Sequence, residues 1–235
     1  MRLVVLLVAA ALLLPHGNAL AAGEDRVSPA AVIHELNLAR QNPAAYARFL
    51  DDMRSSFSGN VRNTAGRVPL LTHEGMRALD EATEFLRKAP PEPPLALSPG
   101  LCQAAADHCR DQTGGSMGHT GHGRSNPGSR ISRYGAWQRG WAENIAYGQH
   151  SAREIVLALI IDDGVPSRAH RRNVFNSTYA VAGAAYGPHA RFGSVCGIDF
   201  AGGYFESGVA SAQRQSASAV QPNARPVFPG EFSRE

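Results

Sequence analysis

The sequence lacks several features that would decide its function class directly. No run of lysine or arginine is dense apart from Arg168, Arg171 and Arg172, and the formal net charge is +3, so nucleic acid is not expected as the main partner. No G-x-S-x-G or H-E-x-x-H motif occurs, which leaves no recognisable serine nucleophile and no compact pair of zinc ligands. No internal repeat is present. The composition is ordinary for a globular protein, and 235 residues suffice for one substantial domain or at most two small ones.

Long hydrophobic runs are also missing, except near the N-terminus. Residues 3–14 form an apolar run that is too short for a transmembrane helix of about 20 residues. Arg2 precedes this run and Ala19–Ala21 offers small residues for cleavage, so residues 1–22 are predicted to be a secretory signal peptide. No cysteine stands at the cleavage point, and a lipoprotein is therefore not indicated. We expect a secreted or periplasmic monomer without an integral membrane span.

The chain has only three cysteines, which fits an oxidising compartment in part. Cys102 and Cys109 are seven residues apart on a predicted helix, so their Cα atoms would lie roughly 10 Å apart, beyond the reach of a disulfide. Either of them could meet Cys196 across the core and leave one free thiol. The alternative is that all three are small buried apolar residues, and the sequence favours neither.

Helices are predicted from capping residues and apolar periodicity. Ser28 and Pro29 begin the first helix, and Asn42–Pro43 interrupts it. Residues 118–135 are rich in glycine and serine and are predicted to form a long loop. The further predicted helices cover residues 44–53, 72–88, 101–112 and 152–161.

Two strands are predicted near the end of the chain. Residues 179–186 and 192–200 are expected to pair through a hairpin loop at 187–191. Because helices come first and paired strands last, the predicted fold class is α+β, as a three-layer αβα sandwich with a largely antiparallel central sheet. The domain is expected to span residues 28–206, followed by a disordered tail at 207–235.

Histidines and acids supply the candidate chemistry. Asp162 and Asp163 end an apolar helix, where negative charge opposes the helix dipole, so a compensating cation or metal is plausible there. Two imidazoles with one or two carboxylates suit a divalent metal site with an open position, and they equally suit an acid–base pair. The candidate residues are His119, His122, Glu143, Asp162, Asp163 and His170.

Several motifs around these residues resemble the CAP superfamily, which includes the cysteine-rich secretory proteins, antigen 5 and the plant pathogenesis-related proteins. The resemblance runs from about Ala31 to Tyr204 and is strongest to the bacterial secreted branch. The motifs that carry it are residues 36–50, Gly118–Thr120, Ala142–Ile145, Arg168–Asn173 and Ser194–Phe200.

The resemblance implies an αβα sandwich whose central cleft is lined by two histidines and two acids. The histidines of such a cleft can hold Zn²⁺ or another divalent metal. His119 and His170 correspond to the histidines, and Glu143 corresponds to the first acid. Asp163 matches the second acid best, with Asp162 as the alternative.

Other residues near the motifs have simpler interpretations. His122 is expected to be exposed and auxiliary, Asn144 to be structural, and His108 to be a satisfied core histidine. The arginines around His170 are expected either to form a solvated face or to neutralise Asp162 and Asp163 by salt bridges, which would weaken a metal interpretation.

These features lead to one main functional hypothesis and two alternatives. The main one is a secreted binding module whose cleft holds a divalent metal and binds an extracellular lipid, glycan or protein, with no organic cofactor. The first alternative is a metal-dependent, protease-like hydrolase in which Glu143 is the base for a metal-bound water. The second is a structural cell-envelope interaction protein.

Overall fold

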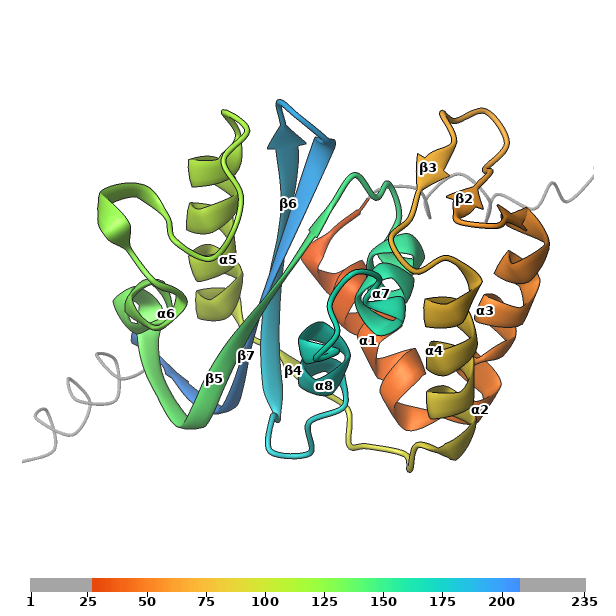
Figure 1. Ribbon diagram of the computed structural model, residues 1–235. Helices are drawn as coiled ribbons and strands as arrows, with labels where there is room; N and C mark the ends of the chain where they lie inside the picture. The colour runs from red at the N-terminus through yellow and green to blue at the C-terminus, as the bar shows by residue number, and fades with distance from the viewer. Residues whose placement is uncertain (1–26, 208–235) are drawn as a thin grey trace, which may run out of the picture.

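The described part of the chain, residues 27–207, forms two layers of helices with a four-stranded sheet between them. This computed structural model is drawn in Figure 1. The predicted α+β fold class and largely antiparallel sheet are confirmed. The predicted signal peptide, and the predicted tail from residue 208 onward, lie outside the described residues. Within residues 27–207, no helix has both the length and the apolarity needed to cross a membrane.

The central sheet has a long strand at one edge. Its order is β4 (Ala96–Leu97), β6 (Val181–His189), β7 (Gly193–Glu206) and β5 (Gly135–Tyr147). β4 pairs in parallel with β6, whereas β7 pairs antiparallel with both β6 and β5. Successive side chains along a strand point to opposite faces, so neighbouring residues of the edge strand β5 contact different helical layers.

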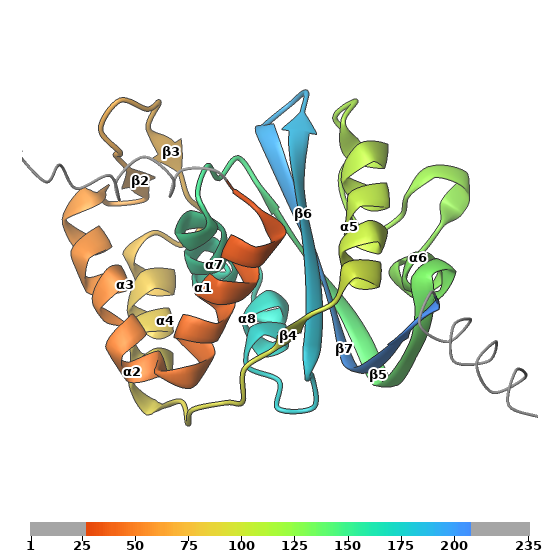
Figure 2. The same cartoon turned by 180° about the vertical axis from the view of Figure 1, so that it is seen from behind.

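The larger helical layer holds the main core, and Figures 1 and 2 show it from opposite sides. α1 (Pro29–Gln41) begins as predicted, because the Ser28 hydroxyl accepts a hydrogen bond from the third residue of the helix. α7 (Ala152–Ile161) packs against α1, and α8 (Ala169–Val174) packs against α7 and β5. The outer elements are α2 (Pro43–Tyr46), α3 (Arg48–Met53), η1 (Arg54–Ser56), α4 (Met76–Lys88) and a small antiparallel sheet of β1 (Phe57–Ser58), β2 (Val61–Arg62) and β3 (Leu70–Leu71).

The smaller layer covers the other face of the sheet with α5 (Pro99–Gln112), η2 (His122–Arg124) and α6 (Pro127–Tyr134). α5 lies directly on the sheet at Gly183 of β6. A Cβ atom at Gly183 would stand only 2.2 Å from the backbone nitrogen of Cys102, so only glycine fits this contact.

The long loop predicted at residues 118–135 is partly wrong, since it contains α6. Asn126 and Ser129 form a reciprocal capping box around Pro127, and this start signal outweighs the local glycine and serine content. The helix predicted at 72–88 begins only at Met76, because Gly75 has a positive φ of 60°. All three cysteines are free thiols, and Cys109 and Cys196 are buried as the second interpretation expected, whereas Cys102 is only partly buried.

Candidate functional site

The edge strand β5 places consecutive side chains on opposite faces of the sheet. Glu143 faces α5 and α6, whereas Asn144 faces the layer that contains α8. Both side chains are buried. The Glu-Asn dipeptide therefore contributes one residue to each side of the strand.

On the α5 face, Glu143 holds His119. Nδ1 of His119 donates to Oε1 of Glu143 at 2.8 Å. The His119 side chain is 52% exposed, whereas that of Glu143 is 1% exposed. A carboxylate can only accept, so Nδ1 of the ring carries a proton, and in the neutral form of histidine this leaves a lone pair on Nε2. We call this arrangement the His119 pair.

A buried arginine from α6 completes the His119 pair. Arg130 donates from Nη2 to Oε2 of Glu143 at 2.6 Å and to the backbone carbonyl of His119 at 3.1 Å. Its side chain is fully buried. Since Arg130 binds both the acid and the loop backbone, it fixes the position of the imidazole relative to the carboxylate.

His108 lies behind the same carboxylate, and burial lowers its pKa. Its Nε2 atom donates to the carbonyl of Gly118 at 2.8 Å and lies 3.7 Å from Oε1 of Glu143. Its Nδ1 atom has no hydrogen-bond partner among the described residues. His108 is thus a core histidine, as predicted, but it also contacts the site and is only partly satisfied.

On the other face, Asp162 holds His170 in a similar arrangement. Nδ1 of His170 donates to Oδ1 of Asp162 at 2.6 Å. The His170 side chain is 24% exposed and that of Asp162 is 2% exposed, so again a buried acid orients a ring that reaches solvent. We call this arrangement the His170 pair.

Asp162 also joins the two helices that flank it. Its backbone adopts the left-handed conformation that ends α7, which aspartate tolerates better than most residues. Its Oδ2 atom accepts from the backbone N–H groups of His170 at 2.9 Å and Arg171 at 3.3 Å, at the start of α8. The carboxylate therefore caps α8 from outside the helix.

Asp163, which the sequence preferred as the second acid, lies elsewhere. Its two carboxylate oxygens accept from the backbone N–H groups of His73 and Glu74, each at 2.7 Å, just before α4. The geometry brings Asp162, and not Asp163, to His170. The reason is the left-handed turn at Asp162, after which the next side chain points towards α4.

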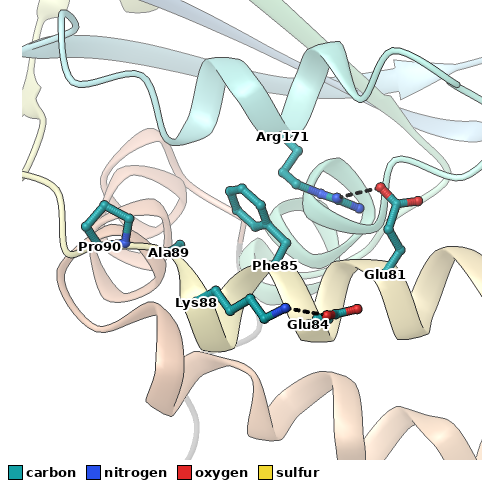
Figure 3. A pocket seen from close by; sticks show the side chains of 7 residues that line it. All are labelled: Glu81, Glu84, Phe85, Lys88, Ala89, Pro90 and Arg171. Carbon is teal, nitrogen blue, oxygen red and sulfur yellow. Dashed lines mark hydrogen bonds and ion pairs between the residues drawn. The ribbon is translucent and has the colours of Figure 1, made fainter.

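Arginines tie α8 to α4 (Figure 3). Arg171 donates to Glu81 at 3.1 Å and lies over the ring of Phe85, beside a cavity of about 490 Å³. Arg168 donates to both Glu74 and Glu81. These ion pairs fix the segment that carries His170 to the outer helix.

One expectation was that the arginines around His170 neutralise Asp162 and Asp163 by salt bridges, and this expectation is wrong. Within residues 27–207, no side chain of Arg168, Arg171 or Arg172 forms an ion pair with the carboxylate of Asp162 or Asp163. Glu81 of α4 pairs with Arg168 and Arg171 instead, and Glu74, just before α4, pairs with Arg168. Arg172 donates to a backbone carbonyl. The carboxylate of Asp162 is left to His170 and the start of α8.

Asn144 links the His170 pair to the edge strand. Its Nδ2 atom donates to the backbone carbonyl of His170 at 3.0 Å, and its Oδ1 atom accepts from Asn173 at 2.8 Å. Glu143 and Asn144 thus orient His119 and His170 from opposite faces of one strand.

The sequence around both histidine–acid pairs matches a known protein family. The model of the cysteine-rich secretory protein family, CAP, matches residues 75–200, more than half of the chain. The chain belongs to the CAP family. That span contains both histidine–acid pairs and ends one residue after Asp199.

Two solved structures are similar to this CAP chain. One is an extracellular protein of Bacillus anthracis that contains an SCP domain, with 20% identity and a TM-score of 0.36 over 54% of this chain and 39% of that one. The other is an outer surface protein of Borrelia burgdorferi, with 16% identity and a TM-score of 0.38 over 54% of this chain and 86% of that one. The chain thus matches about two fifths of the length of the Bacillus protein. The comparison with curated proteins found no match.

The possible metal ligands of the CAP domain are the Nε2 atoms of His119 and His170. Both rings use Nδ1 for a carboxylate, and within the described residues no hydrogen bond involves Nε2 of either ring. A histidine whose second nitrogen is held by a carboxylate is a common arrangement at metal centres. No group of three or more histidine, cysteine or acid side chains close enough to hold a metal occurs in residues 27–207. The described residues therefore offer two imidazole ligands at most.

One candidate residue lies outside the site, and two buried residues near the site were not predicted from the sequence. His122 is exposed in η2, and its backbone N–H donates to Asp111. Arg130 and Asp199 were not among the predicted site residues. The capping signal at Asn126 would have predicted α6, and with it the inward-facing Arg130.

The separation of the two aspartates predicts different effects for their removal. Asp163→Ala should lower the free energy of unfolding by about 1–2 kcal/mol, because it removes two hydrogen bonds to the loop before α4, and should leave the imidazole NMR signals of His170 unchanged. Asp162→Ala should shift those signals, since it removes the ring's partner. Urea unfolding and histidine NMR of both variants test this. Equal shifts of the His170 signals in both variants would contradict the assignment.

Proposed function

We propose that the protein is a secreted binding module whose two histidines together hold one divalent cation and present it to an extracellular ligand. The observation that carries the proposal is that His119 and His170 are each held by a buried acid in the same way. Each ring is oriented through Nδ1 by a buried carboxylate and reaches solvent. Secretion is proposed because residues 1–22 are predicted to be a signal peptide.

The small number of protein ligands bears on what the module binds. Zinc is usually held by three or four protein ligands, so a two-histidine site leaves several coordination positions to water or to a ligand. An oxygen-rich group of an extracellular lipid, glycan or protein would fit those positions. The ligand would then contribute to cation affinity, and the cation to ligand affinity.

The hydrolase alternative receives less support from the geometry. A general base must be able to take a proton from water, yet both oxygens of Glu143 are engaged, one by His119 and one by Arg130. The Glu143 side chain is also almost completely buried. This carboxylate suits the orientation of a histidine better than the activation of a water.

Zinc titration by calorimetry tests the proposal. We expect one Zn²⁺ per chain, with binding lost in both His119→Ala and His170→Ala, because each variant removes one of two ligands. Glu143→Gln and Asp162→Asn should weaken binding by about 10–100-fold through misorientation of the ring. His122→Ala, which removes an exposed histidine of the same loop, is the matched control and should bind zinc normally.

Three outcomes would count against this proposal. Absence of zinc binding by the wild type would overturn the metal site. Retained binding in either single histidine variant would show that the two pairs do not share one ion. Turnover of casein, peptidoglycan or ester substrates that is lost in Glu143→Gln would instead favour the hydrolase.

A further inference from the structure

Behind the His119 pair lies a group of buried polar atoms without protein partners. Seven buried side-chain nitrogen and oxygen atoms of the described residues have no hydrogen-bond partner, and five of them belong to His108, Gln112, Arg130 and Asp199. Buried polar groups are normally hydrogen-bonded, so five such atoms without a partner near Glu143 need a physical reason.

Asp199 is the most unusual member of the group. It is fully buried, and neither carboxyl oxygen has a partner among the described residues. It lies on β7 directly opposite Glu143 of β5, so the two carboxyl side chains point to the same face of the sheet, towards α5. Directly opposite residues of an antiparallel pair have Cβ atoms about 4.5–5.5 Å apart.

Only one of these two acids has a cation bound to it. Arg130 donates to Glu143 and leaves Asp199 without a salt bridge among the described residues. Two carboxylates this close cannot both be ionised cheaply around a single arginine. Burial, with a smaller effect from Glu143, raises the pKa of Asp199 well above its ordinary value. Asp199 is therefore the acid that stays protonated, whereas Glu143 is the acid that pairs with Arg130.

Four further groups close to these acids have pKa values shifted towards their neutral forms. The pKa values of the thiols on α5 and of the phenol on β7 are raised, chiefly by burial, and that of His108 is lowered by burial. Arg130 supplies the compensating positive charge. These neutral groups are Cys102, Cys109, Tyr204 and His108.

We propose that Asp199 is a positioning residue for His119, acting as a buried neutral acid that holds Arg130 in place. Nε of Arg130 is one of the atoms without a partner, and a buried water between Nε and the carboxyl group of Asp199 would satisfy both. Arg130 in turn holds Glu143 and the backbone of His119. The proposed linkage thus runs from Asp199 through the water to Arg130, and from there to Glu143 and the backbone of His119.

This proposal extends the proposed function. It rests on that function only for the role of the oriented His119 ring, which is to bind the cation. Its test uses the mature chain without metal, so its failure is distinct from a failure to bind zinc. The readouts are the tautomer of His119, from the ¹⁵N NMR shifts of the ring, and the pH dependence of urea unfolding. The variants are Asp199→Asn, which keeps the shape and a hydrogen-bonding end, and Asp199→Leu, which removes every polar atom.

The unfolding experiment reports the charge of Asp199. A carboxyl group that is neutral in the fold but ionised in the unfolded chain makes the fold less stable as pH rises above its ordinary pKa of about 3.9. Asp199→Asn lacks this effect. The unfolding constant of the wild type should therefore rise relative to that of the variant by up to about tenfold for each pH unit between pH 4 and 7. A ratio that is independent of pH would overturn the neutral assignment.

The NMR experiment reports positioning. Asp199→Asn should keep the His119 ring in the Nδ1–H tautomer, whereas Asp199→Leu should give a mixture of tautomers, because Arg130 loses its second anchor. Ile198→Val, a change at a buried neighbour on the opposite face of β7, is the control for general loosening and should leave the ring unchanged. If Asp199→Leu does not fold, Asp199→Val serves in its place. An unchanged His119 tautomer in the folded apolar variant would overturn the positioning role.

Discussion

Replacement of Arg130 by methionine should lower the free energy of unfolding by about 3–5 kcal/mol, one of the two largest effects that we expect from a single substitution in this protein. The guanidinium group and the Glu143 carboxylate form an ion pair whose side chains are both almost completely buried. Removal of the arginine leaves a carboxylate that is shielded from water and has only an imidazole as partner. Urea unfolding of the wild type and Arg130→Met measures the loss.

Two further variants show whether the buried charge is the cause. In the double variant Arg130→Met/Glu143→Gln no ion remains buried, so much of the lost stability should return. Arg133 lies on the same helix and pairs with Asp107, but its side chain is 50% exposed. Arg133→Met should therefore cost no more than about 1 kcal/mol. A similar loss in Arg133→Met, or no recovery in the double variant, would refute this account of Arg130.

The same arginine shows where the sequence was informative and where it was not. Glu143 and His119 stood in motifs, and the structure brings them into direct contact. Arg130 stood in a segment whose glycine and serine content favoured a loop, although Asn126 and Pro127 are a standard helix start. The loop prediction relied on composition over a long window and overlooked the four-residue capping signal. Because α6 was not predicted, Arg130 was not recognised as the partner of Glu143.

The choice between Asp162 and Asp163 could not be made from spacing. Adjacent residues have the same sequence environment, and only the backbone conformation decides which carboxylate points to α8. That conformation is the left-handed turn at Asp162, with a φ of 55°. A turn at Asp162, before Gly164 and Pro166, was predictable from the sequence, but the direction in which it sends each carboxylate was not.

Asp199 was hidden for a different reason. Its strand was predicted at residues 192–200 from apolar and β-branched residues, although β7 continues to Glu206. A single acid within such a strand is usually taken to face solvent. Its burial depends on register: Asp199 lies opposite both Glu143 and Gly183, beneath α5. Register across three strands is a tertiary property, which the local sequence pattern does not contain.

The alternation of side chains along β5 explains why one dipeptide can serve both histidines. Glu143 orients His119 through the ring, whereas Asn144 holds the backbone carbonyl of His170 and the amide of Asn173. The two pairs are thus mechanically linked through a single strand but lie in different helical layers. A change at either residue should therefore affect one pair far more than the other.

Asn144→Leu tests this separation and should lower the free energy of unfolding by about 2–4 kcal/mol. Leucine has nearly the shape of asparagine, but it can replace neither hydrogen bond of this fully buried side chain, and each buried group left without a partner costs about 1–3 kcal/mol. The start of α8 should loosen, so the His170 imidazole signals should broaden or shift in NMR spectra. The Nδ1–H tautomer of His119 should stay as in the wild type.

Asn173→Ala is the matched control, since it removes only the bond to Oδ1 of Asn144. It should cost about 1 kcal/mol and disturb His170 less, because the bond from Asn144 to the His170 carbonyl remains. An Asn144→Leu protein in which His119 is disturbed as much as His170 would show that the edge strand moves as a unit. The two faces of β5 would then not act separately, and the assignment of one dipeptide residue to each histidine would have to be abandoned.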